Sequence, residues 1–400
     1  MERNVPKLRF KGFNDELKKE KFQNLVTLQR GSSPRPIIKY ITTSEDGVNW
    51  IKIGDVSTGK TFIDKTAEKI TKEGAEKSRK VQVGDLILSN SMSFGRPYIM
   101  KIDGYIHDGW FVLKNYQKNF NREYLCQLLT SPIIQKQYKR LAAGGVVNNI
   151  SSELVNAVIV NVPSLQEQER IANFLTKVDK IIEKQEEKVK NLENYKKGMM
   201  QKIFSQEIRF KDEKGNEYPE WEEKKLNEIL VAGSKERVKN IKDYQKITIK
   251  LNLKGIEKSL ASREMADTRP FYVREEGEII IGKQNYFNGS IAIVDKEYSG
   301  CICSNAIMSF KVKNENNYYV YNYISQKNYL KKKELFANGT GQKELSEKDF
   351  LNFEIHIPVK EEQNRIANFI LKFDKIVNSE NKKLEQLKQW KKGLLQQMFV

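Results

Sequence analysis

The chain repeats itself at an offset of 195 residues. Positions 162–204 align with positions 357–399 without a gap, and 19 of the 43 residue pairs are identical. Self-similarity at a fixed offset indicates that one structural unit is used twice. Upstream the repeat is fainter, with 83–88 corresponding to 276–281. The sequence therefore predicts the order domain, helix, domain, helix, in which the helical part of each half performs a common task and the domain has been varied.

Each repeated segment has the pattern of one long amphipathic helix. Its apolar residues recur at alternating intervals of three and four, the heptad pattern of a helix with one apolar stripe. Pro163 and Pro358 stand just before the helices, and Glu167 and Glu362 favour the positive end of the helix dipole. At 1.5 Å per residue, about 40 residues span roughly 60 Å. The stripe residues predicted to pair the helices or to dock partners are Ile171, Phe174, Val178, Ile181, Leu192, Tyr195, Ile366, Phe369, Phe373, Ile376, Leu387 and Trp390.

A helix of this length with one apolar stripe requires a partner, and its own copy is the nearest one. We therefore expect the two helices to pair within the chain as an antiparallel coiled coil, and pairing between two chains is the alternative. Gln185 and Glu380 interrupt the stripe at equivalent positions. They either set the register of the helix pair or mark a solvated stretch.

The rest of the chain mixes strand-like and helix-like patterns. Short runs of branched apolar residues at 86–88 and 279–281 indicate strands, and apolar spacing at 122–129 and 318–330 indicates helices. We therefore predict the α+β class, with two mixed α/β globular domains alternating with the two long helices in an internal pseudo-two-fold repeat. The predicted boundaries are 1–162 and 206–357 for the domains, and 163–205 and 358–400 for the helices.

The net charge points to a polyanionic partner. The chain has 70 Lys and Arg against 52 Asp and Glu, a formal charge of +18. Such an excess suggests nucleic acid, anionic lipid or an acidic protein. Segment 1–162 carries 26 basic and 16 acidic residues, whereas segment 205–357 carries 26 and 24. The second domain can bind a polyanion only if its cations gather on one face.

Each domain contains three loops that combine glycine with arginine, lysine, asparagine or glutamine. Glycine lets the backbone approach a phosphate, and these side chains bridge phosphates or contact base edges. One such loop is usually an ordinary polar turn, but loops at corresponding places in both halves strengthen the prediction. The predicted DNA-binding residues of the first domain are Arg30, Ser32, Ser33, Arg35, Asn90, Ser91, Ser93, Arg96, Gly144, Asn148 and Asn149. Those of the second domain are Lys235, Arg237, Lys283, Gln284, Asn285, Asn288, Gly339, Thr340, Gln342 and Lys343.

One enzyme motif is present. The segment 54–61 fits G-x-x-x-x-G-K-[ST], the pattern of a phosphate-binding loop. Such a loop opens a helix, whereas 62–64 has an extended pattern, and the second half lacks the motif. A P-loop NTPase is therefore a minor alternative, and a non-catalytic coiled-coil scaffold that binds only protein is another.

Other chemistry has little support in the residue types. Cys301 and Cys303 lack nearby partners for a four-ligand site, and His107 and His356 are the only histidines, so we predict no metal site and no catalytic residues. Three cysteines make no disulfide framework, which fits a reducing compartment. Since neither an apolar run of membrane-spanning length nor a signal-like start is present, we expect a cytoplasmic protein without a membrane partner.

These features together resemble the specificity subunits of type I restriction–modification systems. The similarity extends over the full length of the chain. Its most specific part is Glu-Gln-x-Arg-Ile-Ala-Asn-Phe at 167–174 and 362–369, each opening a long helix that ends in Lys-Lys-Gly. The opening at 6–10 and the block Gly-Asp-Leu-Ile-Leu-Ser at 84–89 follow the same family.

The resemblance implies two target-recognition domains, each reading one half of a bipartite double-stranded DNA site. The helices would set the gap between the half-sites and dock two modification subunits, which use S-adenosylmethionine to methylate adenine at N6. A restriction subunit with ATP- and magnesium-dependent translocase and nuclease activity would join them. The chain itself would hold no cofactor and would not be an enzyme. The target bases do not carry over, because the recognition domains are the variable part of the family.

Overall fold

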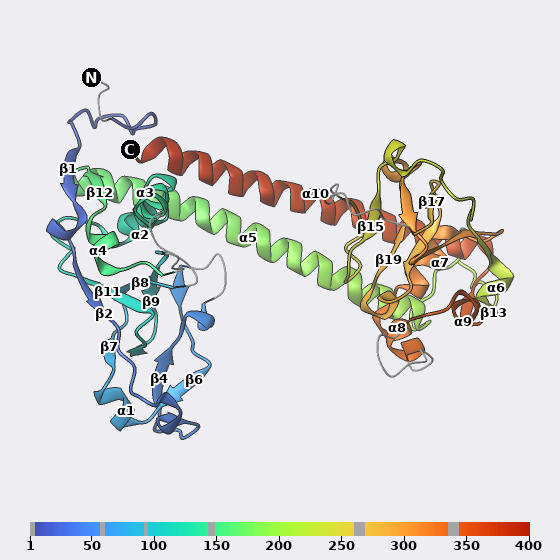
Figure 1. The fold of residues 1–400 in the computed structure, drawn as a ribbon, viewed down its shortest axis with the longest axis horizontal. Coiled ribbons are helices and arrows are strands. Elements are labelled where there is room, and N and C mark those ends of the chain that lie inside the picture. The colour runs from blue at the N-terminus through green and yellow to red at the C-terminus, as the bar shows by residue number, and fades with distance from the viewer. Residues whose placement is uncertain (1–4, 57–60, 92–94, 143–148, 260–268, 335–343) are drawn as a thin grey trace. The chain divides into compact units, whose positions relative to one another are not determined.

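The chain forms two compact units. The structure, a computed structural model, describes residues 5–56, 61–91, 95–142, 149–259, 269–334 and 344–400. Unit 1 consists of Met1–Val189 together with Glu380–Val400, and unit 2 of Lys190–Ser379 (Figure 1). Each unit therefore contains one globular domain and one end of each long helix.

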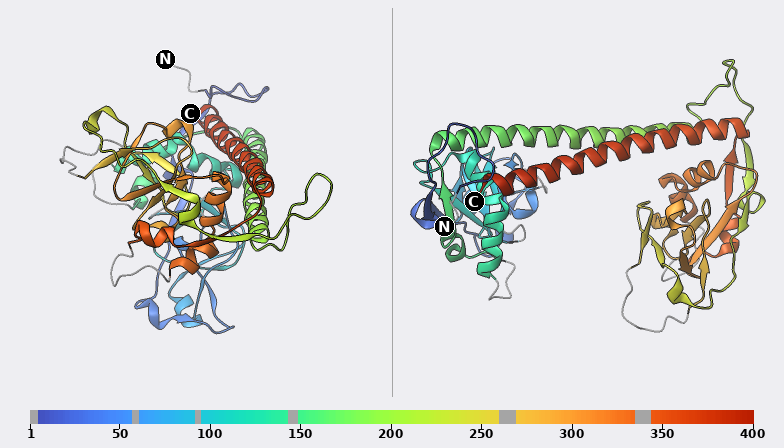
Figure 2. Two further views of the ribbon diagram at one scale, coloured as in Figure 1. Left: turned by 90° about the vertical axis from the view of Figure 1, so that its right-hand side faces the viewer. Right: turned by 90° about the horizontal axis from the view of Figure 1, so that it is seen from above.

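The two repeated segments are single long helices, as predicted. Helix α5 covers Leu165–Phe204 and helix α10 covers Lys360–Met398. In unit 1 the first turns of α5 lie beside the last turns of α10, where Phe174 and Trp390 are 6.4 Å apart between ring centroids (Figure 2). In unit 2 the order is reversed, and Tyr195 stacks on Phe373 at 5.3 Å. An early part of one helix meets a late part of the other in both units, so the antiparallel pairing within the chain is confirmed.

The seam of the helix pair differs from the predicted stripe by one residue in places. Along the middle of α5 the buried stripe consists of Ile171, Leu175, Val178, Ile182 and Val189, a strict alternation of four and three once the half-buried Gln185 is included. Ile181, predicted to pair the helices or to dock partners, has a side chain that is 49% exposed, while its neighbour Ile182 is buried at 9% exposed.

Helix α10 shows the same difference between adjacent residues. Ile376 is 46% exposed, and Val377 is buried in its place at 9%. Of the other predicted stripe residues, Ile366 is buried, whereas Phe174, Leu192, Phe369, Phe373 and Leu387 are half-buried. Tyr195 and Trp390 are exposed by 54% and 47%. Both helices therefore keep an exposed apolar strip beside the buried seam.

Gln185 and Glu380 sit on the seam and bond to each other. The Gln185 amide donates from Nε2 to Glu380 Oε2 at 2.8 Å and to the Glu380 carbonyl at 3.0 Å. Lys188 and Lys383 also contact the Glu380 carboxylate, at 3.0 and 2.8 Å. Because Glu380 is only 7% exposed, this position is not a solvated stretch, and the hydrogen bonds fix which residues face each other.

The globular domain of unit 1 is built on two main sheets. In its described residues, one sheet has the order β2-β11-β8-β9-β5 and the other the order β3-β6-β4-β10-β7, while β1 pairs with β12. Pairs β5–β9 and β4–β10 are parallel and the others antiparallel, so the sheets are mixed, as predicted. The strands are β1 Lys18–Lys21, β2 Thr27–Arg30, β3 Ile41–Thr42, β4 Val48–Ile51, β5 Phe62–Ile63, β6 Glu68–Ile70, β7 Arg79–Val81, β8 Leu86–Ser89, β9 Pro97–Met100, β10 Gly104–Ile106, β11 Trp110–Lys114 and β12 Ile159–Val162. The helices are α1 Lys72–Glu76, α2 Arg122–Thr130, α3 Pro132–Ala142 and α4 Ser152–Asn156.

The globular domain of unit 2 has a related plan. Its described strands form a sheet of order β14-β21-β18-β19 and the pairs β13-β22, β15-β16 and β17-β20. The strands are β13 Glu222–Lys225, β14 Leu230–Ala232, β15 Ile247–Ile249, β16 Ile256–Lys258, β17 Phe271–Val273, β18 Ile279–Gly282, β19 Ile291–Ile293, β20 Ile302–Ser304, β21 Ile307–Val312 and β22 Glu354–Ile357. The helices are α6 Leu226–Ile229, α7 Asn317–Ile324, α8 Lys327–Glu334 and α9 Glu347–Leu351. The single helix expected at 318–330 is wrong, because the chain breaks between α7 and α8, where the buried Tyr286 hydroxyl donates to the Ile324 carbonyl.

The central strand of each domain packs on both faces. In β8, Leu86 and Leu88 join the core that includes α2 and α5, whereas Ile87 faces the second sheet. In β18, Ile279 and Ile281 join the main core, whereas Ile280 faces a separate cluster. Alternate residues of a strand point to opposite faces, so a continuous apolar run is what a strand covered on both sides requires.

Candidate nucleic-acid interface

Four of the predicted residues of unit 1 converge on Asp108, a residue that the sequence analysis missed. The Asp108 carbonyl accepts from Arg30 Nε at 3.2 Å and from Asn90 Nδ2 at 2.8 Å. Its carboxylate accepts from Ser33 Oγ at 3.1 Å and from Arg35 Nη2 at 3.3 Å. Loops that are about 60 residues apart in the sequence therefore meet at one acidic residue between β10 and β11.

The third predicted loop of unit 1 reaches the same surface. Asn149 forms a β-bridge with Ser91, and the next residue, Ile150, donates its backbone N–H to the Asn90 carbonyl at 2.6 Å. Arg30, Asn90 and Asn149 line a hollow of about 520 Å³. Ser93, Gly144 and Asn148 lie outside the described residues. The three predicted loops thus form one surface, which we call the Asp108 surface: Arg30, Ser33, Arg35, Asn90, Ser91 and Asn149 around Asp108.

Close backbone packing holds the Asp108 surface in place. A Cβ on Gly31 would lie 2.0 Å from the His107 carbonyl oxygen, and a Cβ on Gly109 would lie 2.1 Å from the His107 ring. The backbone N–H of Ser32 donates to the Ile106 carbonyl at 3.3 Å. Only glycine allows these approaches, so the glycines of this surface position the loop against β10 rather than leaving it free.

The surroundings of Asp108 and His107 lower the pKa of both groups. Burial opposes the ionisation of Asp108, but the hydrogen bond from Ser33 and the charge of Arg35 hold its pKa below the usual range. Burial lowers the pKa of His107, and its Nδ1 accepts from the Gly109 backbone N–H at 2.7 Å. The Arg35 side chain is 82% exposed, so its ion pair with Asp108 is weak and exchangeable.

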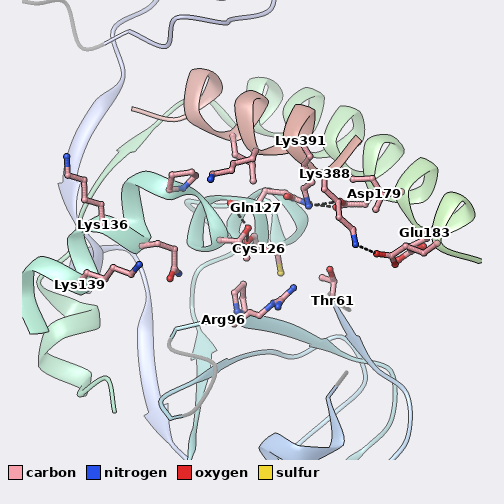
Figure 3. Close-up of a pocket in the computed structure, with 18 residues that line it drawn as sticks. Thr61, Arg96, Cys126, Gln127, Lys136, Lys139, Asp179, Glu183, Lys388 and Lys391 are labelled. Carbon is pink, nitrogen blue, oxygen red and sulfur yellow. Dashed lines mark hydrogen bonds and ion pairs between the residues drawn. The ribbon is translucent and has the colours of Figure 1, made fainter. Parts of the chain in front are cut away.

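Arg96 lies in a different place from the other predicted residues of unit 1. It lines a cleft of about 660 Å³ between α2, α3, the middle of α5 and the last turns of α10 (Figure 3). Lys136 and Lys139 of α3 border the same cleft and are exposed. Asp179 accepts from Gln127 at 2.8 Å and pairs with Lys391 at 2.5 Å, which ties α2 to both long helices. The sequence analysis missed the two lysines because they fall within a helix.

In unit 2 two of the predicted residues, Lys235 and Lys283, lie at α9 or the short connection before it. Lys235 pairs with Glu347 at 2.9 Å, and the Lys283 carbonyl accepts from the Leu345 backbone N–H at 2.9 Å. Arg237 forms a β-bridge with Tyr272. Gln284, Asn285 and Asn288 are exposed in the loop after β18. Gly339, Thr340, Gln342 and Lys343 lie outside the described residues.

A buried arginine supports the Lys235 loop, and sequence reasoning missed it. Arg274 is 2% exposed and donates from Nη1 to the Ser234 carbonyl at 3.2 Å and from Nε to Cys303 Sγ at 3.0 Å. Glu278, 1% exposed, lies 3.9 Å from Arg274. The alternating strand pattern around Arg274 was the available signal, because an arginine at an inward position has to find partners.

The phosphate-loop motif has the wrong structure for that role. Gly54 and Asp55 belong to a short 3-10 turn, Ile53–Asp55, and Thr61 leads directly into strand β5. Residues 57–60 lie outside the described part of the chain. A phosphate loop needs a helix N-terminus after its lysine, and a strand follows here. Across the described residues no helix is long and apolar enough to cross a membrane.

Comparisons with known proteins identify the family of the chain. The family model described as "Type I restriction modification DNA specificity domain" matches residues 17–194 and 218–389. The putative type I restriction enzyme MjaX specificity subunit of Methanocaldococcus jannaschii is 25% identical over 382 residues, covering 90% of this chain and 85% of that protein. The MjaVIII specificity subunit of the same organism is 23% identical, covering 71% of each.

Solved structures share the fold. The S subunit of a type I restriction–modification system from M. genitalium matches with a TM-score of 0.56 at 16% identity, covering 99% of both chains. A chain from a structure concerned with assembly and conformational transition of the type I R-M system matches with a TM-score of 0.57 at 15% identity, covering 96% of this chain and 97% of that one. With two matches to the family model in succession, the chain belongs to the family of type I restriction–modification DNA specificity domains and carries two copies of that domain.

Proposed function

We propose that this chain is the DNA-specificity subunit of a type I restriction–modification complex, and that each globular domain reads one half of a bipartite duplex site. The observation that carries the proposal is the duplication of the specificity domain on paired helices, with unlike loops in the two copies. Two unlike readers on one chain suit an asymmetric split site, since each half-site then has its own domain. We place the two domains at 1–162 and 206–357 and the spacers at 163–205 and 358–400.

The Asp108 surface has the chemistry for reading DNA. Exposed Arg35 and Arg30 suit phosphates or guanine, and the exposed amide of Asn149 suits adenine or backbone. Asn90 is only 5% exposed, and its amide holds the Asp108 carbonyl in place. Asp108 holds Arg30 and Arg35 through single hydrogen bonds, so these two side chains are partly ordered before DNA arrives and can exchange that partner for a phosphate. In unit 2 the exposed Gln284, Asn285 and Asn288 have the same capacity, with Lys235 released from Glu347.

The long helices offer a repeated surface for partner subunits. Exposed Ile181 and Trp390 in unit 1 correspond, at the offset of 195, to Ile376 and Tyr195 in unit 2. Exposed apolar residues that recur in both repeats suit two copies of one protein partner. We infer that this partner is the modification subunit, which supplies S-adenosylmethionine and adenine-N6 methylation, and that a restriction subunit supplies ATP- and magnesium-dependent cleavage in the cytoplasm. This chain contributes recognition rather than catalysis.

The proposal is tested on the complex with its modification subunits. Methylated adenines are mapped on random duplexes for the wild type, Arg30→Ala, Arg35→Ala and, as an exposed cation outside the Asp108 surface, Lys118→Ala. Loss of a direct base contact should weaken methylation by roughly 5- to 150-fold, corresponding to about 1–3 kcal/mol, and relax one half-site only. Lys118→Ala should leave both half-sites unchanged. A wild-type complex that methylates no defined site would refute the function, and wild-type behaviour of both arginine variants would refute the assignment of the surface.

A further inference from the structure

A Glu-Gln pair lies in the first turn of each long helix, outside the recognition loops and outside the exposed helix surface proposed for partner subunits. Glu167 and Gln168 lie in the first turn of α5, and Glu362 and Gln363 lie in the first turn of α10. All four side chains are buried, with exposed fractions of 2%, 0%, 0% and 0%. Charged and amide groups in a first helical turn normally face water, and burying them is unfavourable unless each group is bonded. Their partners therefore indicate what the motif does.

The glutamines bind the start of each long helix to the helical layer of its own domain. Gln168 Oε1 accepts from the Asn121 backbone N–H at 2.9 Å, and its Nε2 donates to the carbonyls of Asn119 at 2.8 Å and Pro163 at 3.0 Å. Asn121 is the N-cap of α2, where its side chain accepts from the Tyr124 backbone N–H. Both Oε1 and Nε2 of the Gln168 amide are therefore hydrogen-bonded where α5 meets α2.

Unit 2 repeats this arrangement. Gln363 Oε1 accepts from the Asn316 backbone N–H at 2.9 Å, and its Nε2 donates to the Pro358 carbonyl at 2.9 Å and to Glu315 Oε2 at 2.6 Å. Asn316 is the N-cap of α7, the counterpart of α2. The same joint is present in two domains whose recognition loops differ, which argues that the joint has a common task.

The glutamates bind a third segment. Arg9 Nε and Nη2 donate to the two oxygens of Glu167, both at 2.8 Å. Arg209 Nη2 donates to Glu362 at 2.8 Å, and the Trp221 indole donates to the same carboxylate at 3.1 Å. Each arginine also donates to a carbonyl farther along its own segment, that of Asp15 at 2.7 Å or of Pro219 at 2.6 Å, so it orders the chain that leads into the domain.

That third segment is bonded to the end of the other long helix. In unit 1 the Leu8 backbone N–H donates to the Gln397 carbonyl at 3.0 Å. In unit 2 the Ile208 backbone N–H donates to the Lys202 carbonyl at 3.2 Å. Each joint therefore fastens the start of one helix, the end of the other and the strand entering the domain.

We propose that Glu167–Gln168 with Arg9, and Glu362–Gln363 with Arg209, are positioning residues that hold each recognition domain at a fixed register on the helix pair. This inference rests on the proposed function. Neighbouring base pairs differ by about 3.4 Å along the duplex and by about 34° around it. A domain that tilts on its helix by a few ångströms can reach a half-site one base pair away. A rigid joint at each end therefore decides how strictly the complex measures the gap.

The test uses the full complex with its modification subunits and duplexes carrying both half-sites at the native gap or at gaps one and two base pairs longer or shorter. The variants are Gln363→Leu, which removes the amide bonds, and Arg209→Lys, which keeps the charge but loses the paired contact. Arg9→Lys makes the same change at the other joint. Leu226→Ala is the control, because Leu226 is a fully buried core residue of unit 2 outside the joint.

We expect the wild type to prefer one gap and the joint variants to lose about tenfold of that preference, the effect of roughly one base-pair mismatch, while reading the same half-sites. Leu226→Ala should lower the melting temperature and retain the wild-type gap preference. Joint variants that melt cooperatively and still reject altered gaps as the wild type does would overturn the proposal. Equal relaxation in Leu226→Ala would also overturn it, since general loosening would then explain the effect. Failure of the proposed function would instead appear as a wild type without any half-site preference.

Discussion

Two adjacent isoleucines provide a sharp test of the helix pairing. The heptad pattern alone predicts Ile181 on the seam, whereas the structure buries Ile182 and leaves Ile181 half exposed, at 9% and 49%. The substitutions Ile182→Ala and Ile181→Ala remove the same atoms from neighbouring positions of one helix. Any difference between them therefore reports which face of α5 is buried in unit 1.

The expected difference follows from the buried fractions. Truncating isoleucine to alanine removes three carbons, worth about 2.4 kcal/mol in transfer free energy when fully buried. Scaled by burial this gives about 2.2 kcal/mol at Ile182 and about 1.2 kcal/mol at Ile181. The cavity left by Ile182→Ala adds to the loss of about 2.2 kcal/mol. This addition is smaller than in a closed core, because Ile182 borders the cleft of Figure 3. The higher helix propensity of alanine offsets a few tenths of a kcal/mol at both positions.

The assay is urea unfolding of the full chain followed by far-UV circular dichroism and tryptophan fluorescence. We expect Ile182→Ala to lower the free energy of unfolding by about 2–4 kcal/mol and Ile181→Ala by about 1 kcal/mol or less, with unchanged dependence on urea. Equal losses, or a larger loss for Ile181→Ala, would refute the seam described here.

Three further predictions concern other parts of the chain. The hydrogen bond from Gln185 and the contacts with two lysines lower the pKa of Glu380 to about 2 from 4.5, so this carboxylate stabilises the fold above pH 4.5, and the contribution is lost as the pH falls towards 2. An acid titration by circular dichroism should show this loss in the wild type and less of it in Glu380→Gln, and identical curves would contradict it. A circularly permuted chain, with residue 400 joined to residue 1 and new ends between 205 and 206, should fold and direct methylation to the same sites. The reason is that the Leu8 backbone N–H already donates to the Gln397 carbonyl near the end of α10. An unfolded product would contradict this prediction. Lys60→Ala should leave methylation unchanged, and saturable ATP binding by the isolated wild-type chain, lost in this variant, would contradict it.

The architecture was readable from the sequence because it depends on periodic patterns. The repeat gave two long helices, and one apolar stripe on each gave their antiparallel pairing. The exact seam was not readable, because Phe174 and Leu175, like Ile181 and Ile182, are apolar neighbours that satisfy the spacing of three and four equally well. Only the partner helix decides between them. The break between α7 and α8 lies beside a contact with a distant residue, Tyr286, whose hydroxyl donates to the Ile324 carbonyl, and the local pattern does not contain that contact.

The sequence predicts which residue types form the candidate site, but it does not predict which residues of the chain they contact. Glycine-rich polar loops pointed to Arg30, Arg35 and Asn90, and the structure brings them together. Asp108 was missed because a lone acidic residue in a loop has no periodic signal. Glu167 was interpreted through the helix dipole, yet its carboxylate is bonded to an arginine 158 residues away. Convergence of segments far apart in the chain is set by tertiary packing, which a single sequence does not contain.

The two repeats differ in a way that follows from what each part contacts. The joint residues recur in both halves as an arginine, a glutamate, a glutamine and an asparagine N-cap, because both joints fasten the same helices. The recognition loops do not recur, yet both use one device: an acidic residue holds an exposed cation, Asp108 with Arg35 in unit 1 and Glu347 with Lys235 in unit 2. The acid comes from a different place in the chain each time, so sequence identity is lost while the physical arrangement persists. When an exposed ion pair holds the cation of a recognition loop, substitutions in that loop alone can change the DNA sequence that the domain reads. A substitution in the joint would instead alter the gap between half-sites for every DNA sequence.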